Sequence, residues 1–148
     1  MIDVQIDESA WTAALADAAD LAKEAALAAS HGAAGEIAIL LTTDEELRAL
    51  NARFLGKDRP TNVLAFPDAS ADRLGDVALA FGVCQREAIE QGKLLGDHLR
   101  HLVMHGVLHL LGYDHISDDD AARMESMERQ LLAAMNVPDP YAEAAKAR

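Results

Sequence analysis

Residues 105–115 read HGVLHLLGYDH and place three histidines, His105, His109 and His115, around a glycine. On a helix, His105 and His109 are about 40° apart around the axis and roughly 6 Å apart along it, so their rings project side by side. Gly112 follows three residues after His109, where a glycine can adopt a left-handed conformation and end the helix. The chain can then reverse and bring His115 back towards the other two rings.

Three imidazoles at this spacing predict a site for one zinc ion, with His105, His109 and His115 as its ligands. Three protein ligands leave a fourth position open, which is typical of catalytic zinc, whereas structural zinc usually has four protein ligands. In the best-known three-histidine site the bound water has a pKa of about 7, so a zinc-bound water is a candidate nucleophile. Imidazoles also bind nickel, copper and iron, so the spacing does not identify the metal.

The spacing H-x-x-x-H-x-x-G-x-x-H resembles the metzincin protease pattern with one change. Those proteases carry a glutamate directly after the first histidine as general base, and Gly106 stands at that place here. Peptide hydrolysis would require another base, for which Glu87, Glu90 and Glu125 are candidates. A metallopeptidase or other small hydrolase is therefore one alternative function.

Three more polar residues near the motif have more than one interpretation. His98 and His101 lie within about 20° and 40° of His105 around the helix, so they extend its histidine stripe. They either orient the site, contact a substrate, or serve packing near the helix start. Asp114 either accepts a hydrogen bond from a ligand imidazole or serves the turn.

The composition indicates one helix-rich domain over residues 1–148, long enough to bury a core. The single cysteine, Cys84, cannot form an internal disulfide, which favours a reducing compartment and a buried thiol. The first residues lack the basic and apolar regions of a signal peptide, and no apolar run approaches membrane-spanning length. We therefore predict a cytoplasmic protein with no membrane partner.

The formal net charge is −12, which argues against attraction of polyanions by the surface as a whole. Four cations nevertheless fall within twelve residues: Arg48, Arg53, Lys57 and Arg59. This cluster is either a local basic strip on an acidic body or a solvated turn.

Hydrophobic periodicity predicts the element order βαβαββααα and an α+β fold, in which helices pack a small mixed sheet and one is a zincin-like metal-binding helix. Strands are predicted at 2–7, 36–42, 61–66 and 76–81. Helices are predicted at 9–30, 43–54, 83–94, 97–111 and 117–135. Thr43 and Ser117 are the predicted N-caps of their helices, and Gly96 is the predicted break between two others.

Several segments outside the motif resemble the YbeY endoribonuclease family of bacterial rRNA-maturation proteins. GKDRPTNVLAFP at 56–67 is similar to the central segment of the family, and LGDVALA at 74–80 is similar to its following strand. DHLRHLVMHG resembles the approach to the histidine motif, and MESMERQLL and DPY fit near the end. The resemblance covers most of residues 47–141.

The resemblance implies a zinc-dependent, single-strand-specific endoribonuclease that acts in small-subunit (16S) rRNA maturation and ribosome quality control. It implies single-stranded RNA, small-subunit rRNA, and the ribosome or its assembly factors as partners. It also implies an α+β fold with His105, His109 and His115 as zinc ligands. A ribosome-assembly factor with a mainly structural zinc is a further alternative.

One position departs from the family. The family typically has an arginine just before the G-K-D segment, and Leu55 stands there in this chain. An arginine at that place can grip a phosphate or stabilise its developing charge, and leucine can do neither. Arg53 and Arg59 are the candidates to substitute for it, unless they are only exposed cations, and Ala65 replaces a usual serine. The sequence does not choose between hydroxide and a ribose 2′-OH as nucleophile, or specify the cleavage site or the oligomeric state.

Overall fold

The computed structural model describes residues 1–68, 70 and 72–141. In this part of the chain, four strands and six helices build an α+β fold, as predicted. The strands are β1 (Ile2–Ile6), β2 (Glu36–Thr42), β3 (Val63–Pro67) and β4 (Arg73–Ala80). The helices are α1 (Ala10–Ala14), α2 (Ala18–Ser30), α3 (Asp44–Leu55), α4 (Phe81–Gln91), α5 (Leu95–Leu110) and α6 (Asp118–Ala134).

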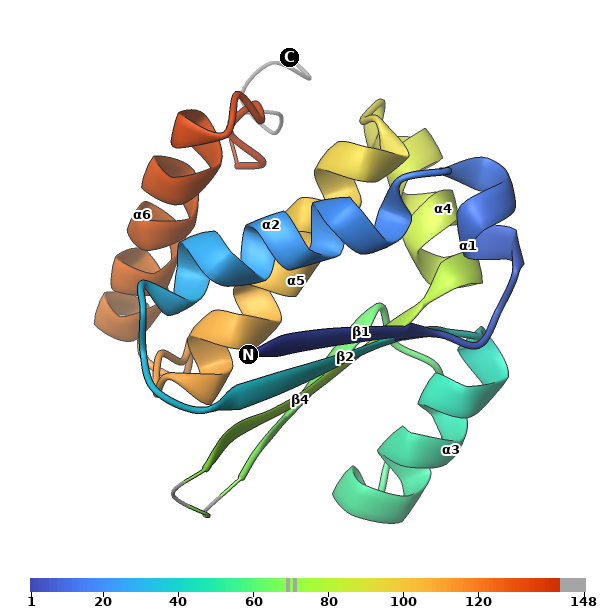
Figure 1. The fold of residues 1–148 in the computed structure, drawn as a ribbon, viewed down its shortest axis with the longest axis horizontal. Coiled ribbons are helices and arrows are strands. Elements are labelled where there is room, and N and C mark those ends of the chain that lie inside the picture. Colours follow the sequence, from blue (N-terminus) through green and yellow to red (C-terminus); the bar gives the residue numbers. More distant parts are fainter. Residues whose placement is uncertain (69, 71, 142–148) are drawn as a thin grey trace.

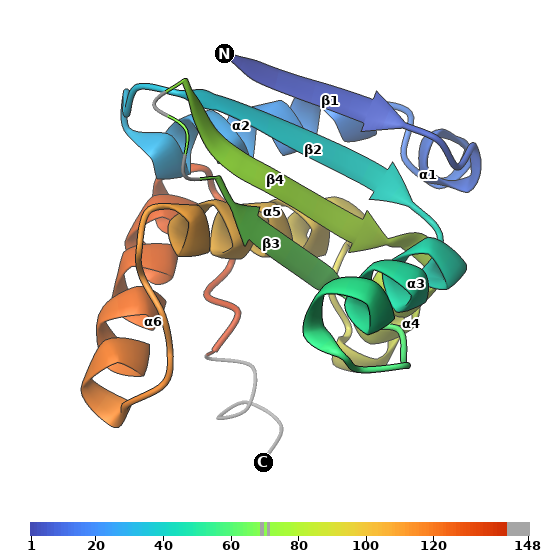
Figure 2. The ribbon, with the colours of Figure 1, turned by 90° about the horizontal axis from the view of Figure 1, so that it is seen from below.

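The sheet is mixed and has the strand order β1-β2-β4-β3 (Figure 2). Strands β1, β2 and β4 are parallel, and β3 runs antiparallel to β4 at one edge. Ile39 of β2 pairs with Val4 on one side and with Val77 on the other, so β2 is the central strand that its apolar sequence predicts.

Helices α2 and α5 cover one face of the sheet, and α3 lies on the other (Figure 1). The alternation of β2 points Ile37, Ile39 and Leu41 into the layer under α2 and α5, where all three are buried. Alanines line the buried side of α2, which lets this helix approach its neighbours closely. The main core thus lies between the sheet and α5, the helix that carries the histidine motif.

The predicted helix over 9–30 is wrong in one respect, because the chain forms two helices there. Leu15 adopts an extended conformation between α1 and α2, and the Ser9 side chain makes no capping hydrogen bond. Trp11 accounts for the break: its indole N–H donates to the carbonyl of Thr42 at 3.0 Å, and its ring is fully buried against Phe81. This contact holds α1 at the end of β2, so the chain must turn before α2 can cross the sheet.

The predicted break at Gly96 is also wrong. Gly92, with φ of 65°, ends α4, whereas Gly96 lies in the first turn of α5. A Cβ at Gly96 would lie 3.1 Å from Leu21 of α2, so this glycine serves helix packing. The other boundaries shift by a few residues, most clearly at β4, which begins at Arg73 instead of residue 76. In the part of the chain that the structure describes, none of the helices combines the length and the apolar composition that a membrane span requires.

Candidate metal centre and adjoining pocket

Helix α5 positions the first two histidines of the motif. Ten of its residues are buried, which fixes its rotation against the sheet. His105 and His109 project from the same side of this helix, and their ring centroids are 4.8 Å apart. Both rings remain partly exposed, so the pair faces solvent from a rigid support.

The third histidine returns to this pair as the sequence predicts. Gly112 has φ of 101°, and its N–H donates to the carbonyl of His109 at 3.0 Å as the helix ends. The ring of His115 then lies 5.7 Å from that of His105 and 5.1 Å from that of His109, between centroids. Ser117 accepts a hydrogen bond from the N–H of Asp120 and starts α6 directly afterwards.

One nitrogen from each of His105, His109 and His115 lies within 4.8 Å of the others, so the set could hold a metal ion. Ligands of one zinc ion at 2.0–2.1 Å are about 3.3 Å apart, which small side-chain rotations reach. Burial lowers the pKa of His109, and the neighbouring His105 and His115 lower it further. The lowered pKa favours the neutral imidazole, which is the form that binds a metal.

A carboxylate that the sequence analysis did not identify lies directly behind the site. Glu128 of α6 is fully buried and accepts hydrogen bonds from His105 Nδ1 at 2.7 Å and His101 Nε2 at 2.9 Å. The hydroxyl of Tyr141 also donates to Glu128. Burial alone would raise the pKa of Glu128, but these three hydrogen bonds outweigh burial and lower the pKa to about 2.

The structure resolves the open interpretations of the other polar residues. His101 contacts the carboxylate behind His105, whereas His98 pairs with Glu87 at 2.9 Å. Asp114 serves the turn, since its carboxylate accepts the N–H of Ile116 at 3.2 Å.

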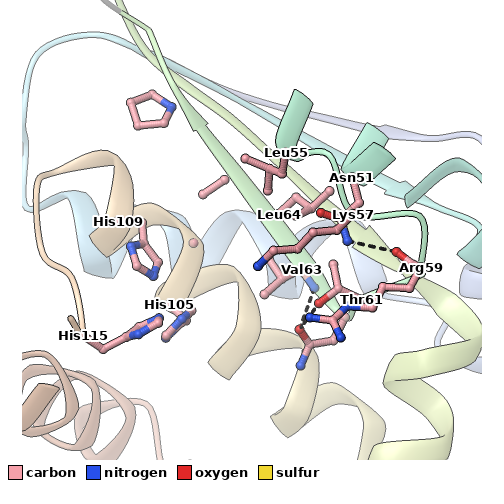
Figure 3. A pocket seen from close by; sticks show the side chains of 14 residues that line it. Asn51, Leu55, Lys57, Arg59, Thr61, Val63, Leu64, His105, His109 and His115 are labelled. Atoms are coloured by element: carbon pink, nitrogen blue, oxygen red, sulfur yellow. Dashed lines mark hydrogen bonds between the residues drawn. The ribbon is translucent and has the colours of Figure 1, made fainter. Parts of the chain in front are cut away.

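The histidines open onto a cavity of about 460 Å³ between α5, β3 and the segment that joins α3 to β3. In Figure 3 the three imidazoles form one side of this pocket, while Lys57, Arg59 and Thr61 lie opposite. Its lining residues are Asn51, Leu55, Lys57, Arg59, Thr61, Asn62, Val63, Leu64, Ala65, Pro67, His105, Gly106, His109 and His115.

The two candidate arginines lie in different surroundings. Arg59 lines the pocket, and the buried Asn51 side chain holds its segment by donating to the Arg59 carbonyl at 2.9 Å. Arg53 does not line the pocket; its guanidinium carbon lies 5.4 Å from the centroid of the Phe54 ring. Leu55, the position at which the resemblance leads us to expect an arginine, also lines the pocket.

The pocket wall is locally cationic although the chain is acidic. No aspartate or glutamate is found among the lining residues within 1–68, 70 and 72–141. Among the described residues, neither Lys57 nor Arg59 has a carboxylate oxygen within 4.0 Å, whereas Arg48 is paired with Asp58 at 2.8 Å. The wall therefore favours an anionic ligand.

The candidate bases for peptide hydrolysis lie elsewhere. Glu87 contacts Asn62 and His98, Glu125 contacts Arg129, and Glu90 does not line the histidine pocket. A Cβ at Gly106 would lie only 2.7 Å from Val77, so the fold excludes the protease glutamate from that position. None of these three glutamates therefore lies where it could act as the general base that the peptidase alternative requires.

Fold and site together define a small α+β protein of the metal-dependent hydrolase class, with a three-histidine centre open to a cationic pocket. The family model described as endoribonuclease YbeY matches residues 2–136. The chain belongs to this endoribonuclease family, and the resemblance inferred from its motifs is confirmed.

Individual relatives agree with this assignment. The chain is 46% identical over an alignment of 157 positions, gaps included, to endoribonuclease YbeY of Paramagnetospirillum magneticum, with 96% of each chain covered. It is 47% identical over an alignment of 146 positions to endoribonuclease YbeY of Maricaulis maris, with 95% of this chain and 91% of the relative covered. The solution structure of TM1509 from Thermotoga maritima matches with a TM-score of 0.62 and 27% identity, over 89% of this chain and 87% of that one.

Proposed function

We propose that this chain is a zinc-dependent endoribonuclease that cleaves single-stranded RNA in the cytoplasm, in the maturation and quality control of small-subunit rRNA. The observation that carries the proposal is the position of Lys57 and Arg59 opposite the three histidines, in a pocket whose described lining residues include no carboxylate. Local cations beside a metal centre, in a chain of net charge −12, favour a phosphate-bearing substrate over a neutral peptide. Family membership supports RNA as that substrate.

His105, His109 and His115 would hold the zinc ion in this function. When bound, the ion supplies Lewis acidity towards a phosphoryl oxygen and lowers the pKa of water. Lys57 and Arg59 donate hydrogen bonds to the non-bridging oxygens of the same or an adjacent phosphate, and so stabilise charge that develops during cleavage. Asn51 fixes the Arg59 backbone and thereby its distance from the histidines.

The shape of the pocket supports an unpaired strand. Apolar side chains of Leu55 and Val63 also line the pocket and can contact a base or ribose. A concave pocket of this kind suits a nucleotide that has left its stack, whereas duplex RNA keeps its bases paired and stacked.

Cleavage of a single-stranded RNA and of its duplex by the purified protein tests the proposal. The His109→Ala variant should lose cleavage by about 100-fold or more, because the loss of one ligand removes the metal. Equal activity of this variant and the wild type would reject metal-dependent cleavage. Elemental analysis of protein purified without a metal-affinity tag should find one zinc per chain.

Arg59→Ala and Arg53→Ala form a matched pair, because both remove one positive charge. Arg59→Ala should weaken RNA binding and reduce the slope of log affinity against log salt by about 1, whereas Arg53→Ala should leave that slope unchanged. Equal effects of the two variants would argue against a phosphate contact in the pocket. Normal rRNA processing by a folded His105→Ala protein, in cells without the original gene, would instead favour a non-catalytic assembly factor.

A further inference from the structure

The geometry points to Glu128 as a positioning residue that orients His105 towards the metal, and this inference rests on the proposed metal centre. Glu128 comes from α6, while His105 lies on α5, so the contact joins two helices behind the site. The Glu128 carboxylate lies 2.7 Å from His105 Nδ1, which leaves Nε2 as the other ring nitrogen that a metal could use.

This contact selects one tautomer of His105. An ionised carboxylate only accepts hydrogen bonds, so the proton of the neutral imidazole resides on Nδ1. Nε2 then presents its lone pair and is the nitrogen available to a cation. Without the acceptor, the ring is free to rotate and to place its proton on either nitrogen, which lowers the fraction of molecules that are ready to bind.

A second set of contacts holds Glu128 itself. Its other oxygen accepts from His101 Nε2 at 2.9 Å and from the Tyr141 hydroxyl. The guanidinium carbon of Arg129 lies 5.0 Å from the centroid of the Tyr141 ring and holds this tyrosine in place. Both oxygens of Glu128 are therefore engaged, so the carboxylate is fixed in rotation as well as in position.

The surroundings of Glu128 favour this role over a purely structural one. Met124 and Leu132, one helical turn on either side, are also buried, and an apolar residue between them would continue the same stripe. A fully buried carboxylate at that position has a large desolvation cost, which several hydrogen bonds must offset. The hydrogen bond that Glu128 accepts from His105 explains why a glutamate, and not an apolar residue, occupies this position.

The chain offers a matched control in Glu87. This glutamate also lies close to a histidine of α5, with its carboxylate 2.9 Å from His98 Nε2, but His98 is not one of the three converging ligands. The substitutions Glu128→Gln and Glu87→Gln therefore make the same chemical change beside a ligand and beside a non-ligand histidine.

The experiment measures the Zn²⁺ dissociation constant of the folded protein by competition with a chelating dye, together with the visible spectrum of the Co²⁺ form. Glu128→Gln should weaken Zn²⁺ binding by about 10- to 100-fold, while Glu87→Gln should stay within about twofold of the wild type. A glutamine side chain has one acceptor, so it cannot serve His105 and the pair of His101 and Tyr141 together. The Co²⁺ spectrum of Glu128→Gln should also change, because the orientation of one ligand ring is no longer fixed.

The outcomes separate this inference from the proposed function. Wild-type protein that binds no Zn²⁺ would overturn the metal centre and the inference together. Wild-type binding with an unchanged dissociation constant in Glu128→Gln would overturn the role of Glu128 alone, even if the melting temperature of the metal-free variant falls. If Glu128→Gln does not fold, Tyr141→Phe decides: weaker Zn²⁺ binding by about threefold or more supports the role, and unchanged binding overturns it.

Discussion

Replacing Gly106 by alanine adds a methyl group where α5 packs against β3 and β4 of the sheet. The new Cβ would lie 2.7 and 3.2 Å from the two methyl carbons of Val77, and 3.5 Å from a methyl carbon of Val63. Val77 is fully buried on β4, between β2 and β3. Either α5 must lift from the sheet or Val77 must leave its rotamer.

Two opposing effects set the size of this change. Overpacking a core by one methyl group costs about 1–3 kcal/mol, whereas alanine in a helix interior is about 1 kcal/mol more favourable than glycine. We expect a net destabilisation of about 1 kcal/mol, which lowers the melting temperature by about 3–4 °C in a chain of this length. Gly96→Ala on the same helix shares much of the helix-propensity gain, and its closest contact is the flexible end of Leu21 at 3.1 Å. The difference in unfolding free energy between the Gly106→Ala and Gly96→Ala variants therefore measures mainly the overpacking at Gly106.

Thermal and urea unfolding of the metal-free protein, followed by circular dichroism, measures both variants against the wild type. Gly106→Ala should be the less stable of the two by about 1–3 kcal/mol, since its clash is with a buried side chain on a strand. A Gly106→Ala protein as stable as Gly96→Ala would refute the argument that close packing requires glycine beside His105. It would also mean that close packing does not exclude a glutamate, as in the protease pattern, from position 106.

Three further predictions concern single side chains. Burial raises the pKa of the Cys84 thiol, so Cys84 should not react with a thiol reagent at pH 8 until the protein unfolds; rapid reaction of native protein would contradict its burial. Burial lowers the pKa of His98, although Glu87 opposes the shift, so the unfolded state binds the proton more readily than the folded state. The stabilising contribution of neutral His98 is therefore present above a pH of about 6.5 and is lost as the pH falls through the folded-state pKa. The urea concentration at the midpoint of unfolding of the metal-free protein should therefore decrease as the pH falls through this range, and it should decrease by less in the His98→Gln variant. Equal decreases in the two proteins would contradict the role assigned to His98. Leu55→Arg should increase cleavage of single-stranded RNA by about tenfold through a new phosphate contact, and no gain in a cleavage assay would show that this position does not reach the scissile phosphate.

The sequence predicted those parts of the site and fold that depend on local spacing. His105 and His109 share a helix face because they are four residues apart, and Gly112 reverses the chain within a few residues of them. Thr43 and Ser117 cap their helices through side-chain contacts to backbone three residues later. Each of these features is fixed by neighbours along the chain, so a single sequence reveals it.

The features that were missed depend on packing between distant segments. Glu128 lies 23 residues after His105, and only the way α6 packs on α5 brings them together. Its sequence signal is a glutamate between Met124 and Leu132 at helical spacing, where an apolar residue would be expected. The break between α1 and α2 likewise depends on Trp11 and Thr42, 31 residues apart, and nothing in the local sequence marks it.

The fold restricts the movement of the three histidine side chains to different degrees. His105 and His109 belong to the helix at the centre of the core, whereas His115 is exposed and follows the turn at Gly112. Moving either helical ring by more than a rotamer change requires opening the core, but His115 can swing out with its short loop. A metal ion at this site would therefore be held by two ligands from a rigid helix, His105 and His109, and by one ligand, His115, from an exposed loop. The rate of metal exchange should therefore depend mainly on the loop that carries His115. The metal affinity should depend mainly on His105 and His109.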